Sequence, residues 1–226
     1  MCGRYTLVKK PEVIEQRFGA TIEKDTFRET FNAAPTQVLP VISNTHPETI
    51  HYFKWGLIPF WAKDASIGNK MINARAETLK EKPSFRKSLQ QKRCLVLADG
   101  FYEWKKEGKT KQPFRITLKD NGLFAFAGLW DEWKDDRGNE VHSFTIITTD
   151  PNDLMASIHN RMPVILPPAH EKHWLSADLK TDDAIGLLVP YNAAHMEAYP
   201  VSTLVNSPAN NSHELIESIE KGAGGQ

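Results

Sequence analysis

The second residue of the chain, Cys2, has a side chain suited to nucleophilic chemistry. A small residue after the initiator methionine usually allows Met1 to be removed, which leaves a cysteine with a free α-amine beside its thiol. That amine has a pKa of about 7.7–8.0, so a sizeable fraction is unprotonated at neutral pH. The amine attacks an aldehyde to form a Schiff base, and the thiol can then close on the imine carbon to give a thiazolidine ring. On position alone, an incidental cysteine near the terminus is the simpler interpretation.

Three further segments carry residue types used in acid–base and anion-binding chemistry. Asn73, Arg75 and Glu77 alternate along the chain, so in an extended segment all three point to one face. Glu103 lies among aromatic residues after an apolar run, where desolvation would raise its pKa toward acid–base use. His159 lies at the expected end of a helix. Taken singly, a surface salt bridge, a core-edge ion pair and a helix-capping histidine explain these residues more simply.

Helices and strands have to position these residues. Proline in the first turn and Gly19 after the last predict a helix over 11–18. Turn chemistry at 120–122 predicts a hairpin between the flanking strands. Because strands and helices do not alternate regularly, the pattern favours an α+β fold, with an antiparallel or mixed β-sheet or partly closed barrel flanked by short helices. Further helices are expected from Pro83, after Asp150, over 170–175 and over 214–219, and strands over 50–55, 94–98, 114–118, 123–129 and 143–149.

Composition restricts the class of protein. The 226 residues favour a single domain over 1–220, with a disordered tail over 221–226. With 28 basic and 28 acidic residues, broad coating of a polyanion is disfavoured, although a small nucleic-acid site with clustered arginines is not. No apolar run approaches the roughly 18 residues of a membrane span, so no membrane partner is expected. Two cysteines and no signal-peptide pattern predict a cytoplasmic protein.

Four spaced motifs, in order along the chain, resemble the SOS-response-associated peptidase (SRAP) family, which includes abasic-site processing proteins. The resemblance runs from residue 2 to about 216 and is specific, because further short segments fit the same pattern. The motifs are Met1–Tyr5, Asn73–Glu77, Ala98–Trp104 and Ile158–Pro163, and the further segments are 32–35, 55–59, 127–130 and 145–148.

The resemblance implies a covalent thiazolidine crosslink to abasic sites in single-stranded DNA, as part of the response to DNA damage. Cys2 is then the nucleophile, Asn73 orients the N-terminus and the sugar, Glu103 assists proton transfer at the amine, and His159 assists sugar ring opening. Imidazole titrates near neutrality, where general acid–base catalysis works well. No cofactor is implied. The protein is expected to be a monomer that associates with the nucleoid when bound to DNA.

Arginines and aromatic side chains are the residues expected to hold the DNA. Arginines beside the catalytic motifs match phosphate-contacting arginines of the family, and tryptophans near Pro59 could stack on bases or wedge a duplex open. For the tryptophans, packing in the core is the alternative interpretation. The predicted DNA-binding residues are Arg4, Arg75, Arg161, Trp55, Trp61 and, less directly, Arg86.

Other functions remain open at this point. A cysteine amidohydrolase with an N-terminal nucleophile also often begins Met-Cys-Gly, and its α-amine serves as the base for the thiol. A peptidase limited to removing Met1, or a single-strand binding module without Cys2 chemistry, would also fit parts of the pattern. A metal site is not expected, because Cys-x-x-Cys and His-x-x-x-His spacings are lacking and Cys94 lies inside an apolar strand.

Overall fold

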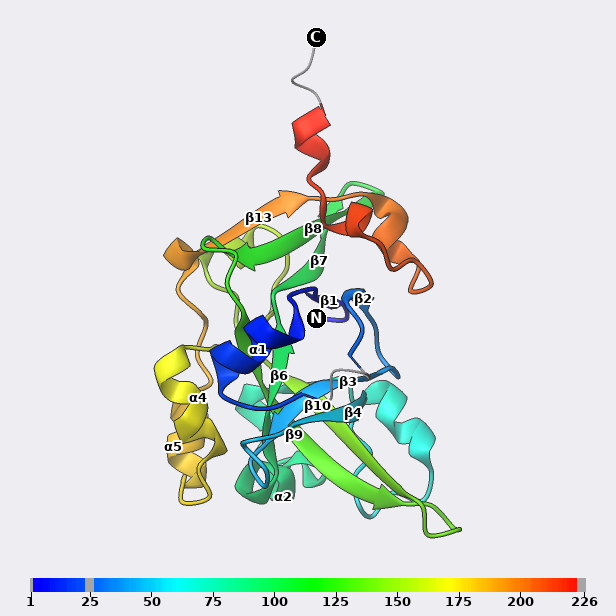
Figure 1. Ribbon diagram of the computed structural model, residues 1–226, viewed down its shortest axis with the longest axis vertical. Helices are drawn as coiled ribbons and strands as arrows, with labels where there is room; N and C mark the ends of the chain where they lie inside the picture. The colour runs from blue at the N-terminus through cyan, green and yellow to red at the C-terminus, as the bar shows by residue number, and fades with distance from the viewer. Residues whose placement is uncertain (1, 23–26, 223–226) are drawn as a thin grey trace.

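A computed structural model gives the structure of residues 2–22 and 27–222. The strands form two sheets, with short helices around them (Figure 1). Of the tail predicted over 221–226, the last four residues lie outside the described part of the chain. Residues 221 and 222 end the 3-10 helix η6 (Ile219–Gly222). In the described ranges, no helix is long and apolar enough to cross a membrane.

Five strands close into a ring. Each strand pairs with the next in the order β3, β4, β10, β9 and β6, and β6 pairs again with β3. All of these pairs are antiparallel except β4 with β10. The partly closed barrel of the sequence prediction is therefore confirmed. The ring strands are β3 (Val38–Ser43), β4 (Ile50–Trp55), β6 (Arg93–Ala98), β9 (Phe124–Lys134) and β10 (Glu140–Thr149).

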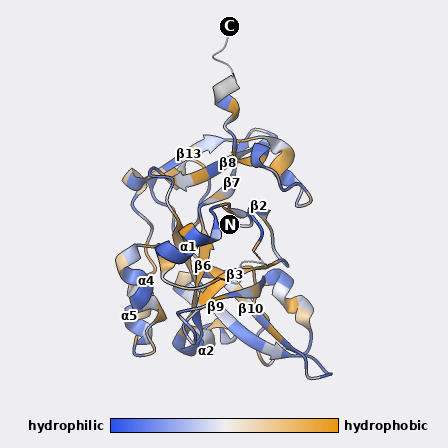
Figure 2. Ribbon diagram, viewed as in Figure 1, coloured by the Kyte–Doolittle hydropathy of each residue, from blue (hydrophilic) through white to orange (hydrophobic). Residues whose placement is uncertain are grey.

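Successive side chains of β6 enter two different cores. Leu95 and Leu97 belong to the cluster that contains Trp174 of a covering helix. Val96 points to the other face and joins a second cluster, which also contains Trp55. This alternation is what a strand buried on both faces produces. In Figure 2 the ribbon is hydrophobic around β6 and β3, whereas the outer helices are mainly hydrophilic.

The second sheet has five strands and carries the start of the chain. Its order is β13, β8, β7, β1, β2, and all of its pairs are antiparallel. Strand β6 of the ring continues through Asp99 into β7 of this sheet. At Gly100 the Arg115 guanidinium packs so closely that an added Cβ would lie 2.8 Å from it, so a larger residue would not fit without a shift. The strands are β1 (Tyr5–Leu7), β2 (Thr30–Ala33), β7 (Gly100–Glu107), β8 (Thr110–Leu118) and β13 (Met196–Pro200).

A buried arginine ties two helices to the ring. Arg93, at the start of β6, donates hydrogen bonds to carbonyls of Leu89 and Gln90 at the end of α2 and of Trp174 and Ser176 at the end of α4. A cation at a helix C-terminus is favourable because the last carbonyls lack partners within the helix. The helices are α1 (Pro11–Phe18), α2 (Pro83–Gln91), α3 (Asp153–Ala156), α4 (Pro168–Leu175) and α5 (Thr181–Gly186).

Two details of the sequence prediction are wrong. The turn at 120–122 does not join a hairpin, because β8 before it and β9 after it lie in different sheets. The hairpins are β7–β8 and β9–β10. Residues 214–219 form no α-helix, since η5 (His213–Ile216) is a short 3-10 helix. The remaining short elements are β5 (Asn73–Arg75), β11 (Met162–Pro163), β12 (Ile165–Leu166), η1 (Ala65–Lys70), η2 (Ala76–Thr78), η3 (Ala193–His195) and η4 (Thr203–Asn206).

Candidate active site

The pairing of β1 with β7 places Cys2 beside Glu103. Tyr5 lies opposite Phe101, and the Tyr102 N–H donates to the Arg4 carbonyl over 3.0 Å. The residues before β1 therefore run antiparallel past the residues after Phe101. Cys2 is completely buried and Glu103 is 2% exposed. The Cys2 thiol lies 3.8 Å from the Arg4 carbonyl.

Glu103 is electrostatically coupled both to the predicted nucleophile Cys2 and to His159. Burial raises the pKa of the Cys2 thiol, and the negative charge of Glu103 raises that pKa further. Burial also raises the pKa of Glu103, while positive charge on His159 opposes that increase. A carboxyl group with a raised pKa exchanges protons closer to neutral pH than an exposed one. The structure thus brings together a neutral thiol, a carboxyl group with a raised pKa and an imidazole.

Main-chain contacts fix the ring of His159. The Arg161 N–H donates to His159 Nδ1 over 3.1 Å, and the His159 N–H donates to the Met155 carbonyl over 2.8 Å. Because a backbone N–H can only donate, Nδ1 acts as the acceptor, and the proton of the neutral imidazole belongs on Nε2. His159 therefore presents Nε2–H as its exchangeable group.

Asn73 has an amide group without a partner among the described residues. Strand β5 runs parallel to β10, with Asn73 opposite Ile146. Both the Oδ1 and the Nδ2 of Asn73 are buried and form no hydrogen bond within the described chain. A buried amide without partners costs roughly 1–3 kcal/mol, so such groups are rare and call for an explanation. A bound polar group that accepts from Nδ2 and donates to Oδ1 would offset that cost.

Trp55 packs in the core, which corrects the prediction that it stacks on bases. Its side chain is fully buried, its ring lies 5.2 Å from that of Tyr5 and 6.2 Å from that of Phe144, and its Nε1 donates to the Ile72 carbonyl. Tyr5 follows the segment of Cys2, and Ile72 directly precedes Asn73. Trp55 therefore links the segments that carry these two residues.

Arg161 already has acidic partners among the described residues, and its predicted contact with a phosphate stays a prediction. Its guanidinium pairs with Asp150 at 2.9 Å and with Glu77 at 2.8 Å, and it donates to the Thr148 carbonyl at 2.8 Å. The Arg161 side chain is 11% exposed. A phosphate would have to displace two carboxylates to bind there.

The other predicted arginines differ in whether their guanidinium groups already have hydrogen-bond partners. Arg4 donates to Asn32 and to the carbonyls of Val205 and Asn206, so it ties the start of β1 to η4. Arg75 is exposed at the end of β5, and its guanidinium forms no ion pair or hydrogen bond with any residue that the structure describes. Arg86 is exposed on α2. Arg75 is thus the arginine beside the site that has the freest side chain, and phosphate binding by all three stays a prediction.

Trp61 lies on the surface, as a stacking residue must. It is 48% exposed and its neighbour Phe60 is 49% exposed, with Lys87 of α2 4.1 Å above the Phe60 ring. The loop that carries both begins and ends close together, since Gly56 packs against the backbone of Gly68. A Cβ added to Gly56 would lie only 2.6 Å from the Gly68 carbonyl oxygen. Base stacking by Trp61 stays a prediction.

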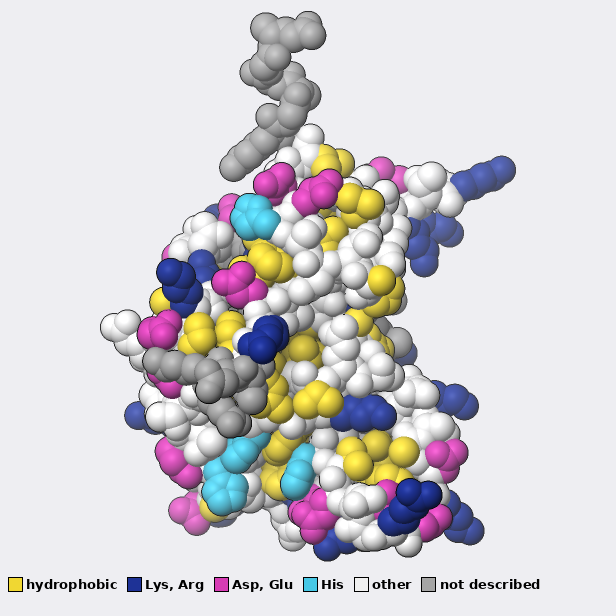
Figure 3. Space-filling model, turned by 45° about the vertical axis from the view of Figure 1, so that its right-hand side comes forward, with side chains coloured by type: hydrophobic (Ala, Val, Ile, Leu, Met, Phe, Trp, Pro, Cys, Tyr) yellow, Lys and Arg dark blue, Asp and Glu magenta, His cyan; other side chains and the backbone are white. Residues whose placement is uncertain are grey.

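Basic side chains form no continuous stripe on the face shown in Figure 3, where they are dispersed among acidic and apolar groups. This fits a net charge of zero. Histidines gather on the lower part of the same face. Among the ring contacts of the histidines, His46 meets His51 edge-on, and His51 and His142 each stack on Phe53. Any phosphate binding here has to rely on a few local arginines.

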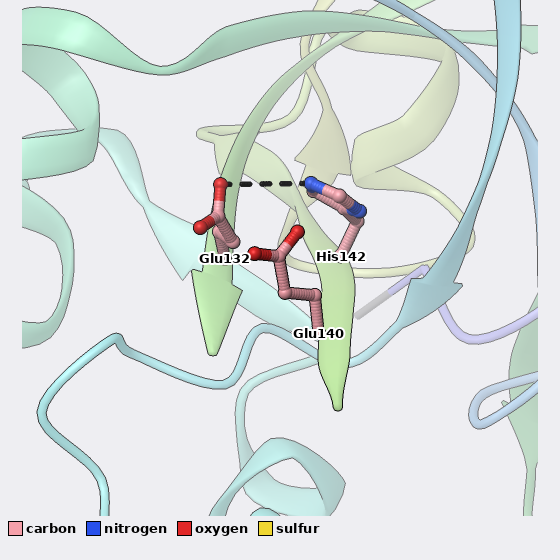
Figure 4. Close-up of side chains that lie close together, drawn as sticks. All are labelled: Glu132, Glu140 and His142. Atoms are coloured by element: carbon pink, nitrogen blue, oxygen red, sulfur yellow. Dashed lines mark ion pairs between the residues drawn. The ribbon is translucent and has the colours of Figure 1, made fainter. Parts of the chain in front are cut away.

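A cluster outside the site combines three groups able to ligate a metal. Glu132, Glu140 and His142 extend from the β9–β10 hairpin, and their ligand atoms lie within 4.8 Å of one another (Figure 4). His142 pairs with Glu132 at 3.7 Å, and Lys134 already neutralises Glu140 at 2.8 Å. Sequence reasoning missed the cluster because it looked for ligand spacing along the chain, whereas this cluster forms across two strands. Its contacts make it an ion-pair cluster, and the expectation of no metal site stays a prediction.

The fold and the site together define a barrel protein that has a buried thiol, a buried carboxyl group and an imidazole beside its first strand. The sequence model of the family described as SOS response associated peptidase (SRAP) matches residues 1–208, so the chain belongs to this family.

Relatives and solved structures support the membership. The chain is 52% identical to abasic site processing protein YoqW of Bacillus subtilis over 96% of this chain and 100% of that protein. It is 33% identical to abasic site processing protein HMCES of Xenopus tropicalis, over 87% of this chain and 68% of that protein. A crystal structure of a protein from Bacteroides thetaiotaomicron is similar with a TM-score of 0.89 and 33% identity, covering 96% of this chain and 99% of that one.

Proposed function

We propose that this chain processes abasic sites in single-stranded DNA by forming a covalent thiazolidine with Cys2 after Met1 is removed. The observation that carries the proposal is the burial of Cys2 beside Glu103, which is itself coupled to His159. The names of the relatives, abasic site processing proteins, support the choice of an abasic sugar as the aldehyde.

The chemistry balances without a cofactor. The ring-opened sugar presents an aldehyde at C1′, and the α-amine of Cys2 attacks that carbon. Loss of one water gives the Schiff base. The thiol then adds to the imine carbon, and its proton passes to the nitrogen, which closes the thiazolidine. His159, when protonated, would donate its Nε2 proton to the ring oxygen as the anomeric hydroxyl loses its proton and the sugar opens. The Glu103 carboxylate would accept a proton from the amine or the thiol.

Selectivity comes from the damage. A base still attached to C1′ prevents the aldehyde from forming, so undamaged strands bind without reacting. A few phosphate contacts and an exposed aromatic side chain hold any sequence, because every nucleotide has a phosphate and every base has a π-face. Single strands are favoured because an abasic sugar in a flexible strand can reach a buried thiol without disrupting base pairs.

A peptidase activity directed at Met1 is the second function that this site supports. The same thiol, carboxyl group and imidazole are present for amide cleavage. The raised pKa of the Cys2 thiol weighs against it, since cysteine peptidases attack with a thiolate. Intact mass spectrometry of protein produced in a host without methionine aminopeptidase activity distinguishes self-removal of Met1 from removal by another enzyme.

The test of the proposed function is a denaturing gel. Protein whose mass shows that Met1 is absent is incubated with single-stranded DNA containing one abasic site, and with the same strand undamaged. We expect a heat-stable band of slower mobility with the abasic strand alone, and an adduct mass equal to protein plus DNA minus one water. Absence of that band would reject covalent processing and leave a binding module.

Arg75 and Arg161 are expected to respond differently to replacement by alanine. Arg75→Ala removes a free guanidinium, so it should weaken binding of all single-stranded DNA and reduce the log–log salt slope by about 0.7. Arg161→Ala removes a paired guanidinium, so it should leave the slope unchanged and lower the free energy of unfolding by about 1–2 kcal/mol. Titrations from low to moderate salt and denaturant melts of both variants decide this. A shallower slope for Arg161→Ala, or an unchanged slope for Arg75→Ala, contradicts the assignment.

A further inference from the structure

The segments that carry Asn73 and His159 both lie against the end of strand β10. β5 pairs with β10 in parallel, with Arg75 opposite Thr148. β11, which begins just after Arg161, pairs with β10 in the antiparallel sense, with Met162 opposite Thr149. Hydrogen bonds of the sheet set the positions of these strands, but the His159 loop precedes β11 and needs a further contact to fix it.

The Arg161 side chain supplies that contact. It reaches the main chain of β10 at Thr148, Asp150 just after β10, and Glu77 in η2 just after β5. Arg161 is 11% exposed, whereas Glu77 is 50% and Asp150 83% exposed. Exposed ion pairs usually contribute little, but removing the partners of a mostly buried guanidinium leaves a poorly solvated charge. Although burial opposes it, the hydrogen bond from Arg161 lowers the pKa of Glu77.

The main chain of Arg161 holds the imidazole. Its N–H donates to His159 Nδ1, and its carbonyl lies 3.3 Å from the same nitrogen. A guanidinium anchored at three points fixes this N–H, and the N–H in turn fixes both the ring orientation and the tautomer. The carboxylates that anchor Arg161 thus act on His159 through Arg161, without touching the ring.

We propose that Glu77, assisted by Asp150, is a positioning residue that anchors Arg161 and thereby keeps the ring of His159 in its orientation and its Nε2–H tautomer. This inference rests on the proposed function for its effect on rate. The effect of Glu77 on the tautomer of His159 does not depend on the proposed function, because that tautomer can be measured on protein without DNA. Glu77 and Arg75 alternate with Asn73 in one motif, so the same short segment supplies an amide to the site, a free arginine and the anchor of the histidine loop.

The experiment compares Glu77→Ala, Asp150→Ala and the double variant with Glu81→Ala, a control that replaces an exposed glutamate four residues further along. Proton–nitrogen correlation spectra of the histidine rings report which nitrogen is protonated, and the His159 signals are identified by their loss in His159→Ala. We expect Nε2–H in the wild type and in the control, and mixed tautomers in the double variant.

Rates at saturating abasic DNA provide the second measurement. We expect a loss of about tenfold in the double variant, since misplacing a catalytic group by an ångström can cost that much or more. Binding of undamaged strands should not weaken, because negative charge has been removed. Glu77→Gln keeps an oxygen that accepts from Arg161, so it should lie between the wild type and Glu77→Ala, and it provides the test if the double variant does not fold.

The outcomes separate the two proposals. Unchanged His159 spectra in Glu77→Ala and the double variant overturn the positioning role, even if the melting temperature falls. Changed spectra with an unchanged rate also overturn it, because the orientation of the ring would then not matter. A wild type that forms no adduct with abasic DNA rejects the proposed function instead, and leaves the spectra to decide whether Glu77 anchors His159.

Discussion

Replacing Cys2 with serine is expected to abolish the heat-stable adduct with abasic single-stranded DNA. The α-amine remains in Cys2→Ser, so a Schiff base can still form. Oxygen is a poorer partner than sulfur for closing the five-membered ring, so the imine stays open and hydrolyses on heating. Borohydride added during the reaction should trap that imine as a stable amine, which a denaturing gel then detects. The expected result is full loss of the band without reductant and its recovery with reductant.

Cys94→Ala is the matched control for Cys2→Ser. Cys94 is the other buried cysteine, and it lies in the same apolar cluster as Cys2. Burial raises the pKa of each thiol, so both are held in the neutral form. Only Cys2 has an α-amine that removal of Met1 can free, so Cys94→Ala should crosslink at nearly the wild-type rate despite some loss of core packing. A heat-stable adduct of Cys2→Ser without reductant would remove the thiol from the mechanism.

The sequence predicts best those elements whose signals are local. Helix 11–18 and strand 50–55 have the predicted bounds. The helix begins with Pro11 and ends at Gly19, whose φ of 66° is the left-handed conformation that glycine favours. Strand β1 was not predicted, because three residues, Tyr5–Leu7, are too few to show a period. Its position depends on pairing with β7 and β2, which are distant in sequence.

The turn at 120–122 shows the limit of local signals. Asn121 has a φ of 53°, as the turn chemistry suggested. The strands on either side nevertheless separate, one joining β7 and β13 and the other joining β6 and β10. Turn residues set the direction of the chain over a few residues, whereas pairing depends on which apolar faces are buried. A local pattern could not settle that choice.

At the site too, sequence motifs identify residues but not the contacts that depend on the fold. Cys2, Asn73, Glu103 and His159 were identified from motifs, and their proposed roles stay predictions. Sequence spacing alone could not decide between a carboxylate partner and a phosphate for Arg161, since Glu77 lies 84 residues away in sequence. Nor could motifs distinguish a tryptophan of the core from one of the surface. Trp55 and Trp61 lie in the same short segment, yet the first is buried and the second exposed.

Replacing Glu103 with glutamine is expected to slow crosslinking by about 100-fold at neutral pH, the lower end of what general acid–base catalysis contributes. Glutamine keeps the shape and the hydrogen-bonding oxygen of the side chain but cannot accept a proton. Binding of undamaged single strands should be nearly unchanged, because a residue that acts on a proton in the transition state affects the rate more than the affinity. Single-turnover rates at saturating DNA, with affinities measured on undamaged strands, separate the two effects.

The crosslinking rates of the wild type and of Glu103→Gln should depend on pH in different ways. Burial raises the pKa of Glu103 above its ordinary value of 4.5. As the pH is lowered, Glu103 is protonated and the wild-type rate should fall. Because the pKa of Glu103 is raised, this decrease should begin at a higher pH than it would with an exposed glutamate. Glu103→Gln should lack this decrease and retain only the titration of the α-amine at about 7.7–8.0. Glu107→Gln, at the exposed end of the same strand, should keep the wild-type profile.

Stability provides an independent measurement of the same group. A carboxyl group whose pKa is higher in the folded state binds protons more tightly there, so ionisation of Glu103 destabilises the fold. Below a pH of 4.5 the carboxyl group is protonated in both states and contributes nothing. As the pH rises from 4.5 through the folded-state pKa, the wild type loses stability relative to Glu103→Gln. The melting temperature of the variant should thus increasingly exceed that of the wild type up to neutral pH. If Glu103→Gln instead binds DNA less tightly, melts lower at neutral pH and keeps the wild-type pH profile, Glu103 holds the structure and is not the base.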